Sequence, residues 1–430
     1  MGSGVSVTKA GGSKAATSPF PAAFADPLTA VDPKLTAAFQ GAIAAVKTNP
    51  AYSALANVDG LPMIIVALND DGTRPFAGAH VNDMFYSGSL LKIAAMYAAF
   101  QLRHAVNAFA LTLDPARITN RNAFFKAVHG AFDAKILSGQ PDLIKTSSTP
   151  GNRVPRYEEI FDASQNGSGV WSVHFHNDPS DPTRDFGGHL DKTIIFSHNP
   201  SAGYVIQKLG FSWMDGVLQK AGLFRPMSKK GIWLAGDYLN PRKMINDEHA
   251  KQVAHDADPS RPEGDPDSVE EFNLGISGWT TVNIPSVNDN LVKQVATCID
   301  VARLFVLLFD SKLVDPNLGS SMDLGNGDME SLLQRAVESS GAPAGMDNAP
   351  SLIGRVPLSG FSITWSKIGV GDLKPVNGGQ KIFSEAMLVN QNADPHRNFV
   401  VVWQNVKAAT DSDLQRIRDI IQKTIDNYHP

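Results

Sequence analysis

The sequence predicts an α+β protein with two lobes: an antiparallel five-stranded sheet flanked by helices from both ends of the chain, and a second, mostly helical lobe. Three observations support this fold class. Strand patterns occur at residues 63–68 and 75–79 and again near the C-terminus, where three follow one another closely. Helix patterns precede the first strands and follow the last ones. The segment between them is mainly helical and carries polar loops.

The composition is that of a folded globular chain. Of its 430 residues, 43 % are hydrophobic and 19 % are charged, and the formal net charge is −5. Acidic and basic residues are mixed without a basic stripe, so we expect no nucleic-acid partner. No apolar run approaches the roughly 20 residues that cross a bilayer, and no signal-peptide pattern is present. The single cysteine, Cys298, excludes an intrachain disulfide and is expected to be buried.

The N-terminal part supplies a tail, a helix, two strands and the central helix. Residues 1–33 are rich in Gly, Ala, Ser and Pro and are expected to form a flexible tail. A helix from Leu35 and the two strands, joined by a turn, follow it. A strong helix then begins near Ser89. Because apolar residues nearly surround this helix, we expect it to be buried at the centre of the molecule.

The remaining elements complete the two lobes. In chain order we expect two short helices (201–223), a helix (297–308), three strands (360–369, 381–390 and 398–405) and an amphipathic terminal helix (412–428). We therefore assign residues 34–103 and 350–430 to the sheet lobe and residues 104–349 to the helical lobe. Two insertions are expected in the helical lobe, at about 104–190 and 241–290.

The motif Ser89-Leu-Leu-Lys92 at the start of the central helix is the first sign of chemistry. Residues i and i+3 share one face of a helix, so the Lys92 amine can reach the Ser89 hydroxyl. Burial among apolar neighbours lowers the pKa of a lysine, and a neutral lysine can accept the hydroxyl proton. Taken alone, the pair also fits a helix cap followed by a surface lysine. The tail contains a second Ser-x-x-Lys at Ser6, where no helix pattern accompanies it.

With this motif placed, the chain resembles the serine β-lactamase and penicillin-binding-protein superfamily, which carries S-x-x-K, S-x-N and K-[ST]-G in that order. The second motif is Ser197-His-Asn199 and the third is Lys367-Ile-Gly369, on an expected strand. Two further strands and a helix follow the third motif, as in the family. The resemblance covers roughly residues 34–103, 190–240 and 290–430.

The resemblance implies a role for each motif residue. Ser89 would be the nucleophile and Lys92 its general base. Ser197 would pass a proton to the leaving group, and Asn199 would hold the substrate amide or the lysine. Lys367 would supply positive charge beside Ser197.

The resemblance also implies an oxyanion hole and a binding strand. The backbone N–H groups of Ser89 and Val370 would form the oxyanion hole, and Ile368 and Gly369 would line the substrate. Position 368 departs from the family, which usually has a Thr or Ser hydroxyl there that helps to bind a carboxylate. The Ile therefore argues against carboxylate recognition.

A second departure concerns deacylation. Class A enzymes use a Glu some 35–40 residues after the second motif, and the nearest acid here is Asp237, which a plain loop also explains. Without such a base a β-lactam would acylate Ser89 and hydrolyse slowly. The sequence therefore favours an amidase, peptidase, esterase or transacylase over an efficient β-lactamase.

Two alternatives stay open. His174-x-His176-x-Asp178 matches the start of a zinc-hydrolase ligand set, although the rest of such a set is missing. A penicillin-binding sensor module that acylates without turnover also fits. The α/β-hydrolase class is excluded, because no G-x-S-x-G occurs in the chain.

We therefore predict a serine hydrolase or acyltransferase that acts through an acyl-enzyme on an amide or ester substrate, peptide-like or β-lactam-like. It needs no cofactor and no metal. The family resemblance favours a periplasmic or secreted location, and the sequence leaves the oligomeric state and the substrate open.

Overall fold

A computed structural model of the chain describes most of the residues expected to form regular structure. The described residues are 18–52, 60–139, 154–181, 184–225, 228, 230–234, 238, 294–314, 325–339, 351–372, 381–393, 397–407 and 410–429. The second expected insertion, 241–290, lies outside this set.

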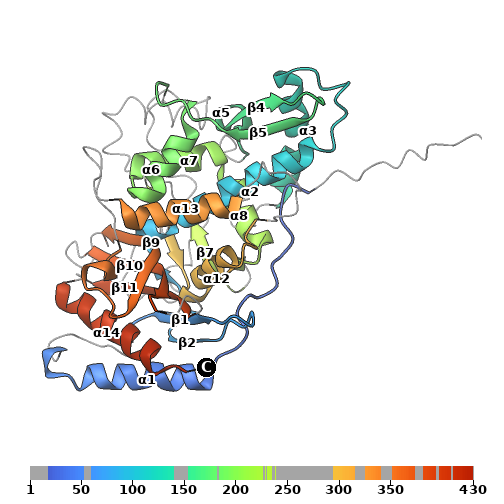
Figure 1. The fold of residues 1–430 in the computed structure, drawn as a ribbon. Helices are drawn as coiled ribbons and strands as arrows, with labels where there is room; N and C mark the ends of the chain where they lie inside the picture. Colours follow the sequence, from blue (N-terminus) through green and yellow to red (C-terminus); the bar gives the residue numbers. More distant parts are fainter. Residues whose placement is uncertain are drawn as a thin grey trace, which may run out of the picture.

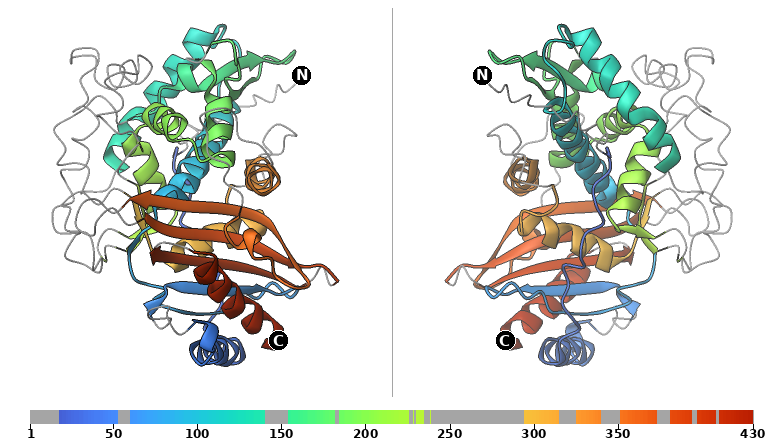
Figure 2. Two further views of the ribbon diagram at one scale, coloured as in Figure 1. Left: turned by 90° about the vertical axis from the view of Figure 1, so that its left-hand side faces the viewer. Right: turned by 90° about the vertical axis from the view of Figure 1, so that its right-hand side faces the viewer.

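The centre of one lobe is a five-stranded sheet in the order β2-β1-β11-β10-β9, with every neighbouring pair antiparallel (Figures 1 and 2). The strands are β1 (Met63–Leu68), β2 (Phe76–Ala79), β9 (Phe361–Asp372), β10 (Lys381–Gln391) and β11 (Asn398–Lys407). N-terminal β1 pairs with C-terminal β11, so both chain ends build one sheet. The predicted α+β fold with its five-stranded antiparallel sheet is confirmed.

Helices cover both faces of this sheet. Helices α1 (Pro33–Lys47) and α14 (Asp411–Asn427) lie on one face, as Figure 2 shows, and α12 (Cys298–Phe309) lies on the other. Alternate residues of a strand point to opposite faces. Accordingly Ile65 of β1 packs in the core beneath α1 and α14, and its neighbour Val66 packs in the core shared with α12. The whole of β1 is therefore buried.

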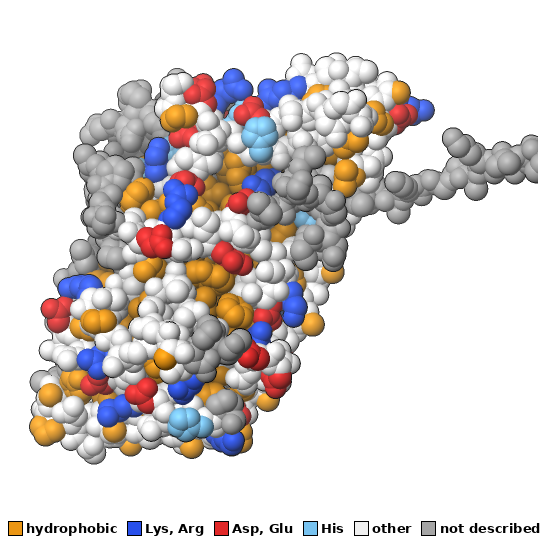
Figure 3. All heavy atoms as spheres, in the orientation of Figure 1, with side chains coloured by type: hydrophobic (Ala, Val, Ile, Leu, Met, Phe, Trp, Pro, Cys, Tyr) orange, Lys and Arg blue, Asp and Glu red, His pale blue; other side chains and the backbone are white. Residues whose placement is uncertain are grey.

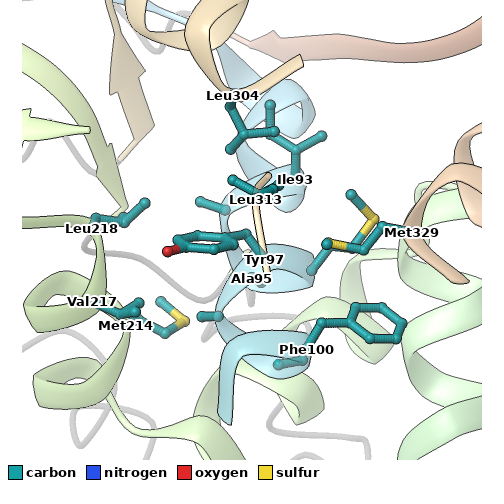
Figure 4. Close-up of a cluster of buried hydrophobic side chains, with 14 of the residues drawn as sticks. Ile93, Ala95, Tyr97, Phe100, Met214, Val217, Leu218, Leu304, Leu313 and Met329 are labelled. Atoms are coloured by element: carbon teal, nitrogen blue, oxygen red, sulfur yellow. The ribbon is translucent and has the colours of Figure 1, made fainter. Parts of the chain in front are cut away.

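Helix α2 (Lys92–Ala110) runs from the sheet into the helical lobe. Every residue of α2 except Ala108 is buried, which confirms the expected central helix. Figure 4 shows Tyr97 and Phe100 of α2 between side chains of α12 and of two further helices, α8 (Phe211–Lys220) and α13 (Gly325–Glu338). The helix begins three residues after Ser89, because the chain first forms one 3₁₀ turn.

The helical lobe contains more regular structure than the sequence suggested. Residues 104–190, expected as short helical pieces and loops, include the 19-residue helix α3 (Arg121–Gly139), whose apolar face is buried. The other elements of this lobe are α5 (Tyr157–Ile160), the hairpin β4 (Phe161–Gln165) and β5 (Trp171–Phe175), α6 (Phe186–Ile195) and α7 (Asn199–Leu209). A four-stranded sheet, β3-β8-β7-β6, lies beside α8 and α12. Its strands are β3 (Phe85–Tyr86), β6 (Phe224–Arg225), β7 (Lys230–Leu234) and β8 (Gln294–Ala296).

Part of the expected tail is packed against the fold. In the helical lobe, the Phe20 ring stacks on Trp213 of α8 at a centroid distance of 5.4 Å. Asp26 receives two hydrogen bonds from Arg303 of α12. Further on, the Asp32 N–H donates to the Phe76 carbonyl of β2. Residues 18–32 therefore join the helical lobe to the sheet, a role that their Gly, Ala, Ser and Pro composition did not indicate.

The surface and the lone thiol agree with the bulk composition. On the face drawn in Figure 3, acidic and basic side chains are interspersed. Cys298 is buried, as predicted, and burial raises the pKa of its thiol. Among the described residues, no helix is long and apolar enough to pass through a membrane.

A buried carboxyl on α8 gives a test of this packing. Asp215 is 1 % exposed, and burial raises the pKa of its carboxyl well above the ordinary value of 3.8. As the pH rises above 3.8 the unfolded chain gains stability by releasing this proton, so Asp215 costs the folded state stability at neutral and higher pH. We expect Asp215→Asn to raise the melting temperature at pH 8, and by less at pH 4.

Thermal denaturation at both pH values measures the effect. Asp114→Asn, at a side chain that is 57 % exposed, is the matched control and should change little. Equal gains at the two pH values, or a loss at pH 8, would contradict the assignment.

Candidate active site

Ser89 lies on the 3₁₀ turn that leads into α2, and Lys92 is the first residue of α2. In this turn, η3 (Gly88–Leu91), the Lys92 N–H donates to the Ser89 carbonyl. Side chains at i and i+3 of a 3₁₀ turn lie directly above one another. The Lys92 Nζ is accordingly 3.1 Å from the Ser89 Oγ. Ser89 itself is partly exposed.

Lys92 is fully buried, at 0 % exposure, and the second motif supplies its other partners. The Nζ donates to the Ser197 carbonyl oxygen and to Asn199 Oδ1, the latter at 2.6 Å. The Ser197 Oγ lies 3.4 Å away. Two motifs about a hundred residues apart in sequence therefore meet at one amine.

The backbone of Ser197 has an unusual conformation that aims it at Lys92. Its φ is +54°, a left-handed value that non-glycine residues seldom adopt. The residue connects α6 to α7, whose N-terminus is capped by the His198 side chain. The His198 N–H donates back to the Lys192 carbonyl near the end of α6. Such backbone strain persists where the surrounding structure enforces it, and it clusters at functional sites.

Lys367 reaches the same serine from the opposite side. It lies on β9, the edge strand of the large sheet, and is 1 % exposed. Its Nζ donates to the Ser197 Oγ at 2.8 Å and lies 3.4 Å from the Ile368 carbonyl. The Ser197 Oγ therefore lies within 3.4 Å of two lysine amines, one from the start of α2 and one from β9.

The pKa values of both lysines are lowered. Burial lowers the pKa of Lys92 well below its ordinary value, and the positive charge of Lys367 lowers it further. Burial alone lowers the pKa of Lys367 to about 7. Both shifts favour the neutral form of the amine, at Ser89 and at Ser197 alike.

Glycines let the edge strand approach the 3₁₀ turn closely. A Cβ on Gly369 would collide with the Ser87 carbonyl and lie 2.9 Å from the Leu90 N. A Cβ on Gly88, whose φ is +53°, would lie 2.9 Å from the Val370 carbonyl oxygen. The third motif therefore needs glycine because β9 packs backbone to backbone against the turn that bears Ser89.

The same contact orients the backbone of Val370. In an antiparallel strand, the N–H and C=O of one residue point to the same side. Since the Val370 carbonyl faces Gly88, its N–H also faces the 3₁₀ turn. The side chain of Ile368 packs, partly buried, in the core between the sheet and helices α1 and α14.

Tyr238 is part of the site and was not anticipated. Its hydroxyl donates to the Gly88 carbonyl at 2.9 Å, and its ring centroid lies 4.7 Å from the Lys92 Nζ. Burial raises the pKa of the phenol well above its ordinary value. Nothing in the sequence around Tyr238 indicates contact with the first motif.

The possible deacylation base cannot be placed beside Ser89, because Asp237 lies outside the described residues. Within the part of the chain that the structure describes, no carboxylate contacts Lys92.

The zinc alternative finds no support in its own residues. The ring of His176 is buried, with its Nδ1 2.9 Å from Asp162 and its Nε2 2.9 Å from the Glu158 carbonyl. Asp178 accepts hydrogen bonds from Ser180 within a turn. No group of three or more potential metal ligands occurs among the described residues. His174 is an exposed residue of β5, whereas His176 follows the end of the strand and is buried.

The close contact of β9 with the 3₁₀ turn can be tested by adding one methyl group. We expect Gly369→Ala to force the strand away from Ser87, at a cost of about 1–3 kcal/mol. The reactivity of Ser89 should fall by more than the accompanying loss of stability, measured as the melting temperature, explains. The reactivity is measured as the rate of covalent labelling of Ser89.

Gly130→Ala on α3 is the matched control, because its Cβ would meet nothing within 4 Å. Labelling of the Gly369→Ala protein at the unaltered rate would show that the contact does not hold Ser89 in place.

Known proteins give similarity of chain arrangement and nothing finer. No protein-family model and no curated protein matches the sequence. The structure is similar to a class A β-lactamase from Bacteroides cellulosilyticus, at 11 % identity over 92 % of this chain and 99 % of that one, with a TM-score of 0.44. It is similar to a β-lactamase from Sphaerobacter thermophilus, at 14 % identity over 90 % of this chain and 95 % of that one, with a TM-score of 0.40. It is also similar to PBP-A, at 13 % identity over 94 % of this chain and 99 % of that one, with a TM-score of 0.36. At such identities and TM-scores the matches assign no residue roles.

Proposed function

We propose that the chain is a serine hydrolase or acyltransferase of the β-lactamase and penicillin-binding type, which forms an acyl ester on Ser89. The observation that carries the proposal is the fully buried Lys92 amine 3.1 Å from the partly exposed Ser89 hydroxyl. A neutral amine at that distance can take the proton as the hydroxyl attacks.

The partners of Lys92 support this direction of proton transfer. A neutral amine has two N–H donors and one lone pair. The Ser197 carbonyl and Asn199 Oδ1 can only accept, so they occupy the two donors. The lone pair is left for a hydroxyl, and the Ser89 hydroxyl is the nearer one, since the Ser197 Oγ is at 3.4 Å. Asn199 and Ser197 therefore orient the base.

Ser197 and Lys367 support departure of the leaving group. As the Ser89 Oγ–carbon bond forms and the carbon–nitrogen or carbon–oxygen bond breaks, the leaving atom needs a proton. Ser197 can donate its own proton and recover one from Lys92, which gained it from Ser89. The Lys367 amine, 2.8 Å from the Ser197 Oγ, favours the charge that develops there.

Two backbone donors are proposed for the oxyanion. The first N–H groups of a helix lack partners within the helix. Ser89 is in the 3₁₀ turn that precedes α2. The Val370 N–H faces this turn from the edge strand. The pair would bind the oxygen that becomes negative when the carbonyl is attacked.

The proposed substrate is an amide or ester that does not depend on a hydroxyl at position 368 for recognition. The Ile368 side chain packs into the core instead of offering a hydroxyl. Gly369 would let the substrate backbone approach β9, in the manner of an added strand. Asp237 stays a candidate deacylation base.

Covalent labelling tests the nucleophile. We expect a fluorophosphonate or a penicillin to add once to the protein, with the adduct on Ser89 in the peptide mass spectrum. Ser89→Ala should abolish the adduct, because the Ser89 hydroxyl is the one nearer to the Lys92 amine, at 3.1 Å against 3.4 Å for that of Ser197. Ser164→Ala, an exposed serine on β4, should label like the unaltered protein. An adduct that survives Ser89→Ala would refute the proposal.

The pH dependence tests the two lysines. Lys367 lowers the pKa of Lys92, so Lys367→Met should raise that pKa and move the rise of the labelling rate to higher pH. In the unaltered protein we expect the rate to fall again above about pH 7, as Lys367 loses its proton. This fall should be absent in the variant, whose maximum should be about 100-fold lower.

The labelling rate measured from pH 5 to 10 gives both limbs of this profile. Superimposable pH profiles for the two proteins would contradict the assignment of the lysines.

Turnover separates an enzyme from a sensor module. With a chromogenic ester or β-lactam, a hydrolase or transferase should show a steady-state rate after the first turnover. A burst equal to the protein concentration with no later rate would indicate the sensor instead.

A further inference from the structure

Tyr238 contacts both Gly88 and Lys92 in the proposed site, and the three motifs account for neither contact. Its hydroxyl donates to the Gly88 carbonyl at 2.9 Å. Its ring covers the Lys92 amine, with 4.7 Å from the Nζ to the ring centroid. The residue itself has a left-handed φ of +64°, which a non-glycine residue rarely adopts.

The hydrogen bond acts on the peptide group that ends in the Ser89 N–H. The Gly88 carbonyl and the Ser89 N–H belong to one planar unit, so fixing the oxygen also fixes the direction of the N–H. Gly88 has no side chain and a φ of +53°, and therefore needs an external restraint. A donor on the carbonyl also polarises the peptide, which makes its N–H a stronger donor.

The ring acts on Lys92. Oxygen atoms of Ser89, Ser197 and Asn199 contact the Nζ, and the Tyr238 ring adds an apolar surface to this shell. An aromatic face attracts a cation, but it replaces water, which solvates an ammonium group better. Covering the amine therefore favours its neutral form, the form that can accept a proton.

We propose that Tyr238 is a positioning residue for acylation: its hydroxyl orients the Ser89 N–H toward the oxyanion, and its ring keeps Lys92 out of water. This inference rests on the proposed function of Ser89 and Lys92. It assigns to Tyr238 a part in acylation that is separate from that of the candidate deacylation base Asp237.

Two substitutions separate the hydroxyl from the ring. Tyr238→Phe keeps the ring and loses the hydrogen bond, so we expect Ser89 to be labelled by a fluorophosphonate about 10-fold more slowly, with an unchanged pH midpoint. Tyr238→Leu removes the ring as well. Water can then reach Lys92, so labelling should be slower still and its midpoint should move to higher pH.

Tyr97→Phe is the matched control, since Tyr97 is a buried tyrosine on α2 whose hydroxyl has no hydrogen-bond partner among the described residues. It should leave the labelling rate unchanged. Melting temperatures of all variants report any general loss of structure.

The possible outcomes are distinct. The inference is supported if Tyr238→Phe slows labelling and Tyr97→Phe does not, while the two variants have similar melting temperatures. It is also supported if the pH midpoint of labelling rises in Tyr238→Leu but not in Tyr238→Phe. Unaltered labelling of Tyr238→Phe, or equal slowing by Tyr97→Phe, overturns it while Ser89 remains the nucleophile. Absence of any adduct on Ser89 in the unaltered protein overturns the proposed function, and the inference with it.

Discussion

The amine of Lys92 must find inside the protein the hydrogen bonds that it gives up in water, because an unpartnered buried amine is costly. Its side chain is 0 % exposed, and its partners come from segments that are far apart in sequence. The 3₁₀ turn supplies Ser89, and the connection between α6 and α7 leads to Ser197 and Asn199. The ring of Tyr238 covers one side of the amine. The helical lobe and the sheet lobe must therefore close on each other for this one group to be stable. The same burial favours the neutral amine that the proposed chemistry needs.

The position of the sheet decides where this closure occurs. Helices cover both faces of the sheet, so its edges are what remains for contact with other backbone. Edge strand β9 meets the 3₁₀ turn through Gly369 and Gly88, where a side chain would collide. An edge strand has N–H and C=O groups without strand partners, which suits it to bind a substrate backbone. Lys367 lies on this edge, and from there its amine reaches Ser197. The position of β9 at the edge of the sheet therefore determines both the contact with the 3₁₀ turn and the position of Lys367 in the candidate site.

The sequence predicted the site in unequal parts. The contact between Ser89 and Lys92 followed from helical spacing alone, because local geometry fixes i and i+3. The meeting of Ser197 with Lys367 rested on the order of three motifs, since no local rule relates residues that far apart. Tyr238 could not be predicted, because a loop tyrosine gives no pattern that identifies its partner. The His-x-His-x-Asp pattern matches a ligand set in its spacing alone. Only the tertiary structure shows that His174 is exposed on β5 while the His176 ring is buried against Asp162.

Local patterns by themselves determined the strands of the five-stranded sheet, the central helix and the fold class, since the period of apolar residues reflects which face each element buries. They did not reveal α3 as one long helix, nor that residues 18–32 would pack across both lobes, because single aromatic anchors such as Phe20 leave no periodic signal. Only the tertiary structure decided the left-handed backbone of Ser197 and the depressed pKa of Lys367. The first depends on the connection between α6 and α7 and the second on desolvation, and neither is encoded in a spacing along the chain.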